Sequence, residues 1–387
     1  MSSSSSPPLP HILGLSSSGQ ALPIHLGAMR YLQEHTDILE HVDTFVAASG
    51  GALLAGFLAA KVPLHEITKA MTQMDFVKTL QPSIPSFIQT GGMVSQKAFD
   101  IQVQLVLAKG LGERKARTLT LAQLKEDMGI TLVLSVVRFR MKDMTRENIK
   151  NTLLYLDPVN QPDVPLYRAL TIACTIPGVV EPAFIEGFDG LFFDGALLNA
   201  SPFVSANEEE TLAIRLVQPV NSDQTTRING LRDTISMFFG MLKQTVSFTE
   251  EMLLEAQDFC PRFVETHRVC EINCEDYPSL TLSVSRQHKE KMIRVGYDTL
   301  KDHLEQHFPS WVLEHKKEFL PTQEIEEESE DEDEEIIEED EDEEIEEDEE
   351  GQEEEALSSI VMSMQAHDWE TGPEPRRRRR REQCSIQ

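Results

Sequence analysis

Residues 44–60 read TFVAASGGALLAGFLAA, and this stretch decides the fold class. Thr44–Ala48 is a short apolar run that predicts a buried strand, and Ala52–Ala60 has the composition of a buried helix. Ser49 and two glycines lie between them, where small residues suit a tight turn. The stretch therefore predicts a strand, a sharp turn and a helix.

The same alternation begins upstream and continues through the chain. His11–Leu15 is another apolar run, and after the loop 16–19 the apolar spacing becomes helical at Leu26, Met29, Leu32 and Leu39. Strands that alternate with helices predict an α/β fold with a mainly parallel sheet. Further helices are expected at about 64–73, 94–109, 120–127, 167–175, 228–258 and 286–306, and further strands within 130–140, 184–193, 212–218 and 263–272.

The composition of the chain limits the classes of protein and of partner that it fits. The 387 residues suffice for one large domain, and 25 of the negative charges behind the net charge of −31 lie in Glu324–Glu355, which leaves −6 for the rest. The acidity therefore belongs to one tail, and no nucleic-acid partner is expected. Five unevenly spaced cysteines do not form a disulfide scaffold. The Ser/Pro-rich start lacks an apolar signal region, so a cytoplasmic location is expected.

Ser49 is a candidate nucleophile. A serine in a strand-to-helix turn exposes its hydroxyl, and the helix N-terminus supplies unpaired N–H groups and positive potential. The motif positions Ala47, Ser49 and Gly51 match the G-x-S-x-G elbow with Ala in place of the first Gly. The alternative is an ordinary turn of small residues that caps a helix.

Two other segments could complete the chemistry. Ser17, Ser18 and Gly19 follow the first strand, where their backbone N–H groups, with that of Gly50, could form an oxyanion hole. Asp194 follows an apolar run and precedes the motif residues Gly195 and Ala196, so its carboxylate could deprotonate a serine directly. The alternatives are a Ser-rich turn and a common Asp-Gly turn, such as Asp189-Gly190.

The order of these motifs resembles the patatin-like phospholipase family, whose members carry a Gly-rich oxyanion loop, a G-x-S-x-G elbow and a late D-G-[GA] motif. The resemblance extends over about residues 11–306. It implies a three-layer α/β fold and a lipid acyl hydrolase in which Ser49 and Asp194 act as a dyad through an acyl-enzyme. The expected partner is a phospholipid or another lipid ester. The resemblance implies no cofactor and no metal.

The oxyanion loop departs from the family pattern G-G-G-x-R-G. Ser17 and Ser18 replace two glycines, Ala21 replaces the arginine and Leu22 the last glycine. If those glycines require positive φ angles, serine costs about 1 kcal/mol or more and the loop rests differently. The alternative function is therefore a catalytically inactive protein of the same fold that binds a membrane or a partner.

Domain boundaries follow from composition. We expect a disordered leader at 1–10, the hydrolase domain at 11–320, a disordered polyacidic segment at 321–356 and a tail at 357–387. The tail holds six arginines, Arg376–Arg381, and ends as a possible prenylation motif at Cys384. A prenyl group with a polybasic neighbour would anchor the protein to the cytoplasmic face of an anionic membrane in a eukaryotic cell, whether the protein is the cell's own or that of a virus or pathogen acting inside it. A nuclear-localisation signal is the alternative for the basic run.

Cys260, His267, Cys270 and Cys274 could suggest a zinc site, but their spacing matches no standard pair of zinc ligands.

Overall fold

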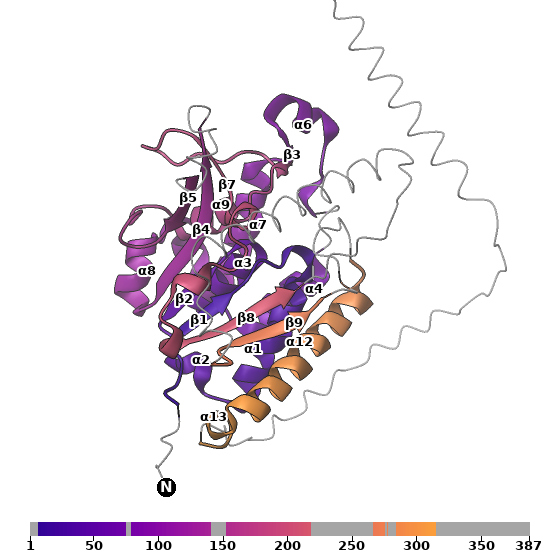
Figure 1. The fold of residues 1–387 in the computed structure, drawn as a ribbon. Helices are drawn as coiled ribbons and strands as arrows, with labels where there is room; N and C mark the ends of the chain where they lie inside the picture. Colours follow the sequence, from indigo (N-terminus) through magenta and orange to yellow (C-terminus); the bar gives the residue numbers. More distant parts are fainter. Residues whose placement is uncertain are drawn as a thin grey trace, which may run out of the picture. The chain divides into compact units, whose positions relative to one another are not determined.

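A mainly parallel sheet forms the centre of the computed structural model (Figure 1). The structure describes residues 7–74, 79–140, 152–217, 266–274, 277 and 284–314, which all lie within one compact unit of the chain. Five strands of the sheet are parallel: β1 (Ile12–Leu15), β2 (Thr44–Ala47), β4 (Thr131–Phe139), β8 (Thr211–Val217) and β9 (Val269–Asn273).

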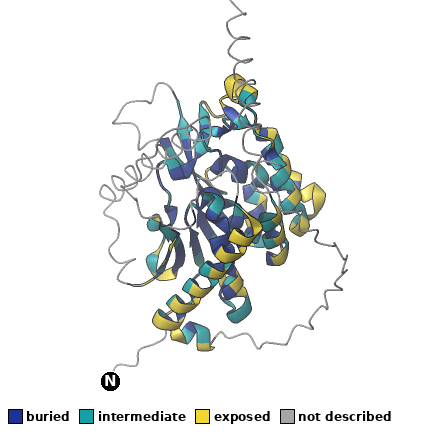
Figure 2. Ribbon diagram, turned by 90° about the vertical axis from the view of Figure 1, so that its right-hand side faces the viewer, coloured by how far each residue is buried: buried dark blue, intermediate teal, exposed yellow. Residues whose placement is uncertain are grey.

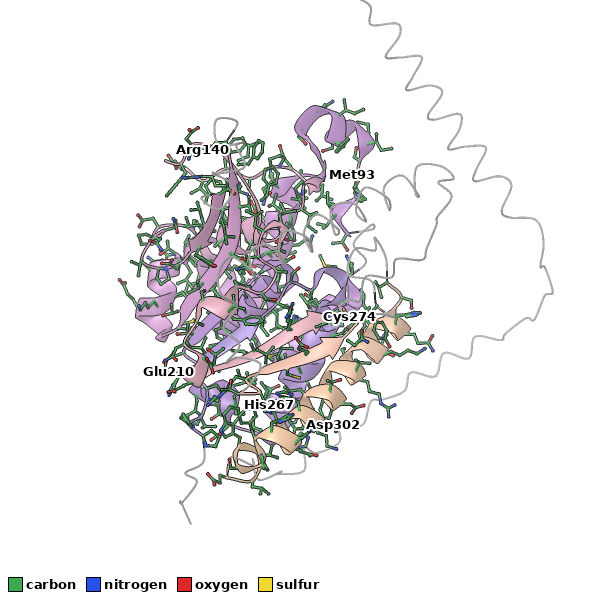
Figure 3. All side chains as sticks on the ribbon, in the orientation of Figure 1. Met93, Arg140, Glu210, His267, Cys274 and Asp302 are labelled. Atoms are coloured by element: carbon green, nitrogen blue, oxygen red, sulfur yellow. The ribbon has the colours of Figure 1, made fainter. Side chains whose placement is uncertain are left out.

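Two further strands pair antiparallel with β4, namely β5 (Leu153–Leu156) and β7 (Leu191–Asp194). The order across the sheet is β5-β4-β2-β1-β8-β9, with β7 also on β4. A separate parallel pair joins β3 (Gly92–Val94) to β6 (Gly178–Val180). In Figure 3, Arg140 and Cys274, which follow β4 and β9, lie higher than Glu210 and His267, which precede β8 and β9.

Helices cover one face of this sheet and its ends. The connection from β1 to β2 contains the 3₁₀ turn η1 (Gly19–Ala21), α1 (Leu22–His35) and α2 (Ile38–His41). The connection from β2 to β4 contains α3 (Ser49–Ala59), α4 (Leu64–Gln73), α6 (Ile84–Thr90), α7 (Gln96–Thr118) and α8 (Leu121–Met128). Later come α9 (Leu166–Ala173), α12 (Arg286–His307) and α13 (Pro309–Glu314).

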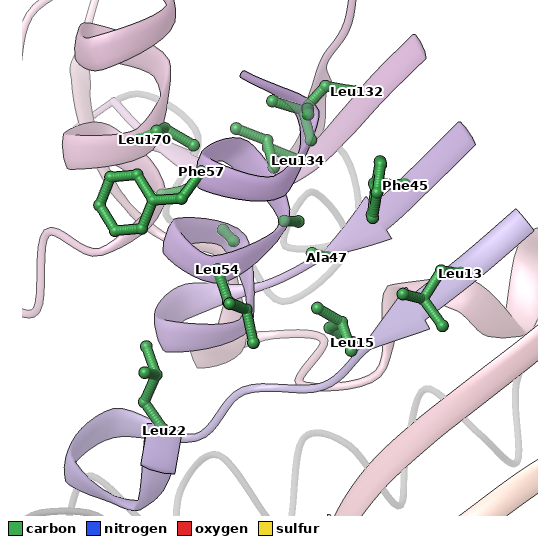
Figure 4. Packing of buried hydrophobic residues seen from close by; sticks show 14 of the residues in the cluster. Leu13, Leu15, Leu22, Phe45, Ala47, Leu54, Phe57, Leu132, Leu134 and Leu170 are labelled. Carbon is green, nitrogen blue, oxygen red and sulfur yellow. The ribbon is translucent and has the colours of Figure 1, made fainter. Parts of the chain in front are cut away.

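The alternation of side chains along the strands divides the core into two layers. Leu13, Phe45 and Leu132 pair across adjacent strands and point to the face that α1, α3 and α9 cover. They belong to the same buried cluster as Leu22, Leu54 and Leu170 of these helices (Figure 4). Val46 and Ala213 point to the opposite face, where Phe203 of the 3₁₀ segment Pro202–Ser205 covers them. Figure 2 shows the strands buried and the outer surface of α12 exposed.

The predicted α/β class, with a mainly parallel sheet flanked by helices, is confirmed. The helices expected at 64–73, 120–127, 167–175 and 286–306 are present. The helix expected at 94–109 begins at Gln96 and runs to a kink at Gly112, where φ is 75°, and a second helical stretch follows to Thr118. In the described segments no helix has the length and apolar composition that a bilayer span requires. The helix predicted at 228–258, the polyacidic segment, Arg376–Arg381 and Cys384 lie outside the described residues.

Three local predictions are wrong. The strand predicted at 263–272 begins at Val269, because His267 has a φ of 54° and lies in a turn. Of the range 184–193 only residues 191–193 are in a strand, as part of β7, because Gly187 and Gly190 adopt φ values of 82° and 115°. Residues 7–10 of the predicted disordered leader contact the fold, since Trp311 Nε1 donates a hydrogen bond of 2.9 Å to the Pro7 carbonyl. The sequence patterns also did not predict α6, α13, β5 or the β3–β6 pair.

Candidate active site

Ser49 lies at the point where β2 turns into α3. It is 4% exposed and has a φ of 54°, a left-handed conformation that non-glycine residues rarely adopt. The next two positions are crowded, and at Gly51 the crowding atom belongs to the backbone, so that position must be glycine. A Cβ on Gly50 would lie 2.4 Å from Ser18 Oγ, and a Cβ on Gly51 would lie 2.4 Å from the Ser16 carbonyl oxygen. The strained backbone and its close neighbours form the sharp elbow that a nucleophilic serine requires.

Asp194 is the last residue of β7 and is 2% exposed. Its Oδ1 accepts a hydrogen bond of 2.8 Å from the Ala196 N–H. Burial raises the pKa of the Asp194 carboxyl from 3.8 to about 7, while the interaction with the nearby Ser49 side chain and the hydrogen bond from the Ala196 N–H act in the opposite direction. The carboxyl is therefore held beside the serine, with a pKa near neutrality.

Strand β4 brings these two residues together. Both β5 and β7 pair with Val136 and Val137, so they occupy opposite edges of β4, and β7 shares its edge with β2. Strand β2 runs parallel to β4 and β7 antiparallel to it, so the two strands run toward each other. Ser49 follows the end of one strand, and Asp194 ends the other.

The glycine of the Asp-Gly-Ala motif allows β7 to end this close to β4. A Cβ on Gly195 would lie 2.3 Å from the carbonyl carbon and oxygen of Ser135, the residue of β4 between the two pairings. The chain beyond this turn returns to the first loop, where the Ala200 carbonyl accepts a hydrogen bond of 2.8 Å from the Ser17 N–H. The Asp194 turn and the serine-rich loop are therefore bonded to each other.

The hydrogen bond from Ser17 to Ala200 shows that one of the predicted oxyanion donors is wrong. The Ser17 N–H is already donated to Ala200, so Ser17 is wrong as a member of the oxyanion hole. Across the described residues, the backbone N–H groups of Ser18, Gly19 and Gly50 have no acceptor. Gly50 lies in the first turn of α3, and a Cβ there would be 3.1 Å from the Gly19 nitrogen, so the two segments are adjacent. Free donors at a helix N-terminus suit an oxyanion.

The two serines do not strain the loop. Among non-glycine residues of the described segments, positive φ angles occur at Ser49, Lys61, Gln81 and His267, so Ser17 and Ser18 have none. Gly19, the family glycine that remains, has a φ of 50°. The substitutions therefore fall where serine is tolerated. Ser18 is 1% exposed, and its hydroxyl has no hydrogen-bond partner within the described structure.

A family model described as patatin-like phospholipase matches residues 15–207. This range holds the elbow, the Asp-Gly-Ala turn and the whole connection from β1 to α1. Residues 15–207 belong to the patatin-like phospholipase family. Among curated proteins, none matches this sequence.

Solved structures resemble the patatin-like domain in fold. VipD from Legionella pneumophila superimposes with a TM-score of 0.54 at 16% identity, covering 78% of this chain and 68% of VipD. ExoU, solved in complex with SpcU of the Pseudomonas aeruginosa type III secretion system, gives a TM-score of 0.46 at 12% identity and covers 79% of this chain. The chain spans about half the length of ExoU (53%). At such identities the likeness to VipD concerns the fold alone.

One residue of the patatin-like site carries no motif and was not predicted. Cys174, at the end of α9, is buried, and its Sγ donates a hydrogen bond of 2.8 Å to the Ser49 carbonyl oxygen. Burial, with a smaller contribution from the Asp194 charge, raises the pKa of the Cys174 thiol well above its ordinary value. The group is therefore a neutral thiol, which can donate to the strained serine backbone.

His25 of the patatin-like domain supports the first loop. Its Nε2 lies 3.1 Å from the Ser16 carbonyl oxygen, to which it donates. Burial lowers the pKa of His25 from 6.5 to about 4, so the imidazole is neutral. No group of three or more His, Cys, Asp or Glu side chains in the described ranges is arranged to hold a metal ion.

Proposed function

We propose that this protein is a serine lipid acyl hydrolase with Ser49 as nucleophile and Asp194 as general base. The observation that carries the proposal is a buried Asp194 carboxyl that lies beside the Ser49 side chain, at the point where β2 and β7 end, and whose pKa is about 7. A base works best when its pKa lies near the working pH, because it is then ionised and still basic enough to take a proton. The lipid substrate class follows from the family of residues 15–207.

The reaction begins when Ser49 Oγ attacks the ester carbonyl carbon and its proton passes to the Asp194 carboxylate. The carbonyl oxygen becomes an oxyanion, which the N–H groups of Gly50, Gly19 and Ser18 stabilise in place of the Ser17 donor excluded above. Collapse of this intermediate breaks the ester bond, and Asp194 returns the proton to the departing alcohol. The products of this half-reaction are an acyl-Ser49 enzyme and a free alcohol.

Water completes the cycle. Asp194 accepts a proton from the water that attacks the acyl-Ser49 carbonyl, and the same N–H donors stabilise the second oxyanion. The intermediate collapses to release the carboxylic acid, and Ser49 Oγ recovers a proton from Asp194. No histidine is required, in keeping with the neutral His25 that donates to Ser16.

A fluorophosphonate probe tests the proposal, because it reacts with an activated serine. We expect the full chain to be labelled and Ser49→Ala to abolish both labelling and ester hydrolysis. Asp194→Asn should reduce both by about 10²–10⁴-fold, since it removes the base. The matched control is Asp189→Asn in the exposed Asp-Gly turn, which should react like the wild type. Labelling that persists in Ser49→Ala would refute Ser49 as the nucleophile, and no labelling of the wild type would favour the inactive, partner-binding alternative.

We also propose that the tail recruits the enzyme to the cytoplasmic face of an anionic membrane. Arg376–Arg381 and the possible prenylation site Cys384 support this proposal, because one prenyl chain needs a second signal for stable anchoring. In a eukaryotic cell, Cys384→Ser should move the protein from the membrane fraction to the soluble fraction. The Ser49→Ala variant should remain with membranes, and equal fractionation of wild type and Cys384→Ser would refute prenylation.

A further inference from the structure

Ser18 has a buried side chain that the architecture of the fold does not explain. The residue is 1% exposed, and its Oγ has no hydrogen-bond partner in the described part of the chain. A serine that precedes a helical turn ordinarily accepts a hydrogen bond from the first N–H groups of that turn. Ser18 precedes the 3₁₀ turn Gly19–Ala21, yet its side chain accepts no such bond. Because a buried polar group without a partner destabilises a fold, its presence here points to another use.

The Ser18 hydroxyl lies against the helical turn that follows the nucleophile. A Cβ built on Gly50 would lie 2.4 Å from Ser18 Oγ. A carbon–carbon single bond adds about 1.5 Å, so Oγ lies within about 4 Å of the Gly50 Cα. Gly50 directly follows Ser49 in the first turn of α3. The unpaired hydroxyl is therefore a neighbour of the serine elbow.

Backbone donors of the same two segments also lack an acceptor. Among the residues that the structure describes, these donors are the N–H groups of Ser18, Gly19 and Gly50. The Cβ position of Gly50 that meets Ser18 Oγ is also 3.1 Å from the Gly19 nitrogen, so the two segments are in contact. The N-terminal end of α3 adds positive potential. Three N–H groups and one hydroxyl without an acceptor suit a ligand atom that only accepts, such as an oxyanion.

The burial of Ser18 agrees with a place in the site. Ser49 is 4% exposed and Asp194 is 2% exposed, so the hydroxyl is enclosed to nearly the same degree as the proposed dyad. In such surroundings a hydrogen bond to a charged oxygen is stronger than in water, because the local dielectric constant is low. A hydroxyl beside the elbow can therefore stabilise charge that develops there.

We propose that the Ser18 hydroxyl donates a hydrogen bond to the oxyanion that forms when Ser49 attacks the ester. This inference rests on the proposed function and adds a catalytic residue to it. The proton stays on Ser18 Oγ throughout, so Asp194 remains the base. The family pattern has glycine at this position, and glycine has no side chain that could donate. The departure at Ser18 thus gives the oxyanion loop one donor more.

The test compares the hydrolysis of p-nitrophenyl butyrate by the full chain and by its Ser18→Ala variant. Because the oxyanion exists only once Ser49 has attacked, kcat should fall about tenfold to a hundredfold while KM stays within about twofold. A trifluoromethyl ketone, which forms a tetrahedral oxyanion on an active serine, should bind more weakly by the same factor. Ser18→Gly restores the family glycine but also lacks the hydroxyl, so it should lose as much activity as Ser18→Ala.

Thermal stability separates this role from a structural one. Ser18 Oγ has no partner to lose, so Ser18→Ala should melt at or above the wild-type temperature. Ser16→Ala is the matched control in the same loop. Ser16 Oγ accepts a hydrogen bond of 2.9 Å from the Leu216 N–H and donates one of 3.2 Å to the Ser17 carbonyl. Ser16→Ala should therefore lower the melting temperature and leave kcat within about threefold of the wild-type value.

Two outcomes would refute the role of Ser18 and leave the dyad in place. One is a Ser18→Ala variant whose kcat and affinity for the ketone stay within about twofold of the wild type while Ser49-dependent hydrolysis persists. The other is a loss of kcat with unchanged affinity for the ketone and a melting temperature lowered as far as in Ser16→Ala. If the wild type hydrolyses no ester and is not labelled, the proposed function itself is wrong, and the role of Ser18 is refuted with it.

Discussion

Ala47 and Asp194 end two strands that run toward each other along one edge of β4, where they pair with Leu134 and Val136. Two residues along a strand correspond to about 7 Å, so the strand ends nearly meet. Ser49 lies on one side of the gap between the strand ends, in a left-handed turn, and the Asp194 carboxyl lies on the other side. The position of the proposed dyad is thus a property of strand pairing rather than of any loop.

The first prediction concerns the pH dependence of the reaction. Because the pKa of Asp194 is raised to about 7, the carboxyl is protonated in acid and cannot accept the serine proton. The rate of fluorophosphonate labelling should fall about tenfold per pH unit below 7 and level off above it. Labelling from pH 5 to 9 tests this, with Asp189→Asn as control. A flat profile would argue against Asp194 as the base.

The second prediction concerns the pH dependence of stability: protonation of the Asp194 carboxyl should stabilise the fold, whereas its ionisation is needed for activity. Its pKa in the fold lies above the value of 3.8 expected in the unfolded chain, so the protonated form favours folding. The free energy of unfolding should therefore fall as the pH rises from about 4 to 7. Asp194→Asn removes this cost of about 1.4 kcal/mol per pKa unit, so it should be more stable than the wild type at pH 8. Denaturant unfolding at pH 5 and 8 measures the difference, which should shrink at pH 5.

Gly195→Ala should damage both stability and activity. The added Cβ would lie 2.3 Å from the Ser135 backbone, so β7 must move away from β4 and carry Asp194 with it. We expect a loss of about 1–3 kcal/mol of stability and near-complete loss of labelling. Gly187→Ala is the control, since its φ of 82° imposes backbone strain but no atom lies within 4 Å. Gly187→Ala should lower the free energy of unfolding by about 1 kcal/mol and keep full labelling.

Cys174 should act as a positioning residue for the serine turn. Cys174→Ala removes the donor to the Ser49 carbonyl, a hydrogen bond expected to contribute about 0.5–1.5 kcal/mol. The labelling rate should fall about threefold to tenfold, and Cys174→Ser should recover part of it because the hydroxyl can also donate. Cys270→Ala, which removes a buried thiol from β9, should lower the melting temperature without slowing labelling. Equal labelling of Cys174→Ala and the wild type would exclude the role.

Local patterns in the sequence predicted much of the domain. The predicted apolar runs that begin at residues 11, 44 and 212 coincide with the strands β1, β2 and β8, and the helical spacing between them is realised in α1, α3 and α4. These features depend on neighbours a few residues apart, so periodicity reveals them. The short elements β3 and β6 escaped prediction because three residues carry no detectable period and each strand is completed by the other.

The sequence by itself determined the fold class, the strand-turn-helix around Ser49 and the carboxylate before Gly195. Only the tertiary structure decided that Ser49 and Asp194 lie side by side. It also decided that the Ser17 N–H donates to the Ala200 carbonyl and that the Cys174 thiol donates to the Ser49 carbonyl. The partners in these contacts are separated by more than 100 residues, and no local spacing encodes which edge of β4 a distant strand will occupy. The pKa of Asp194 follows the same reasoning, since burial by the assembled chain raises it.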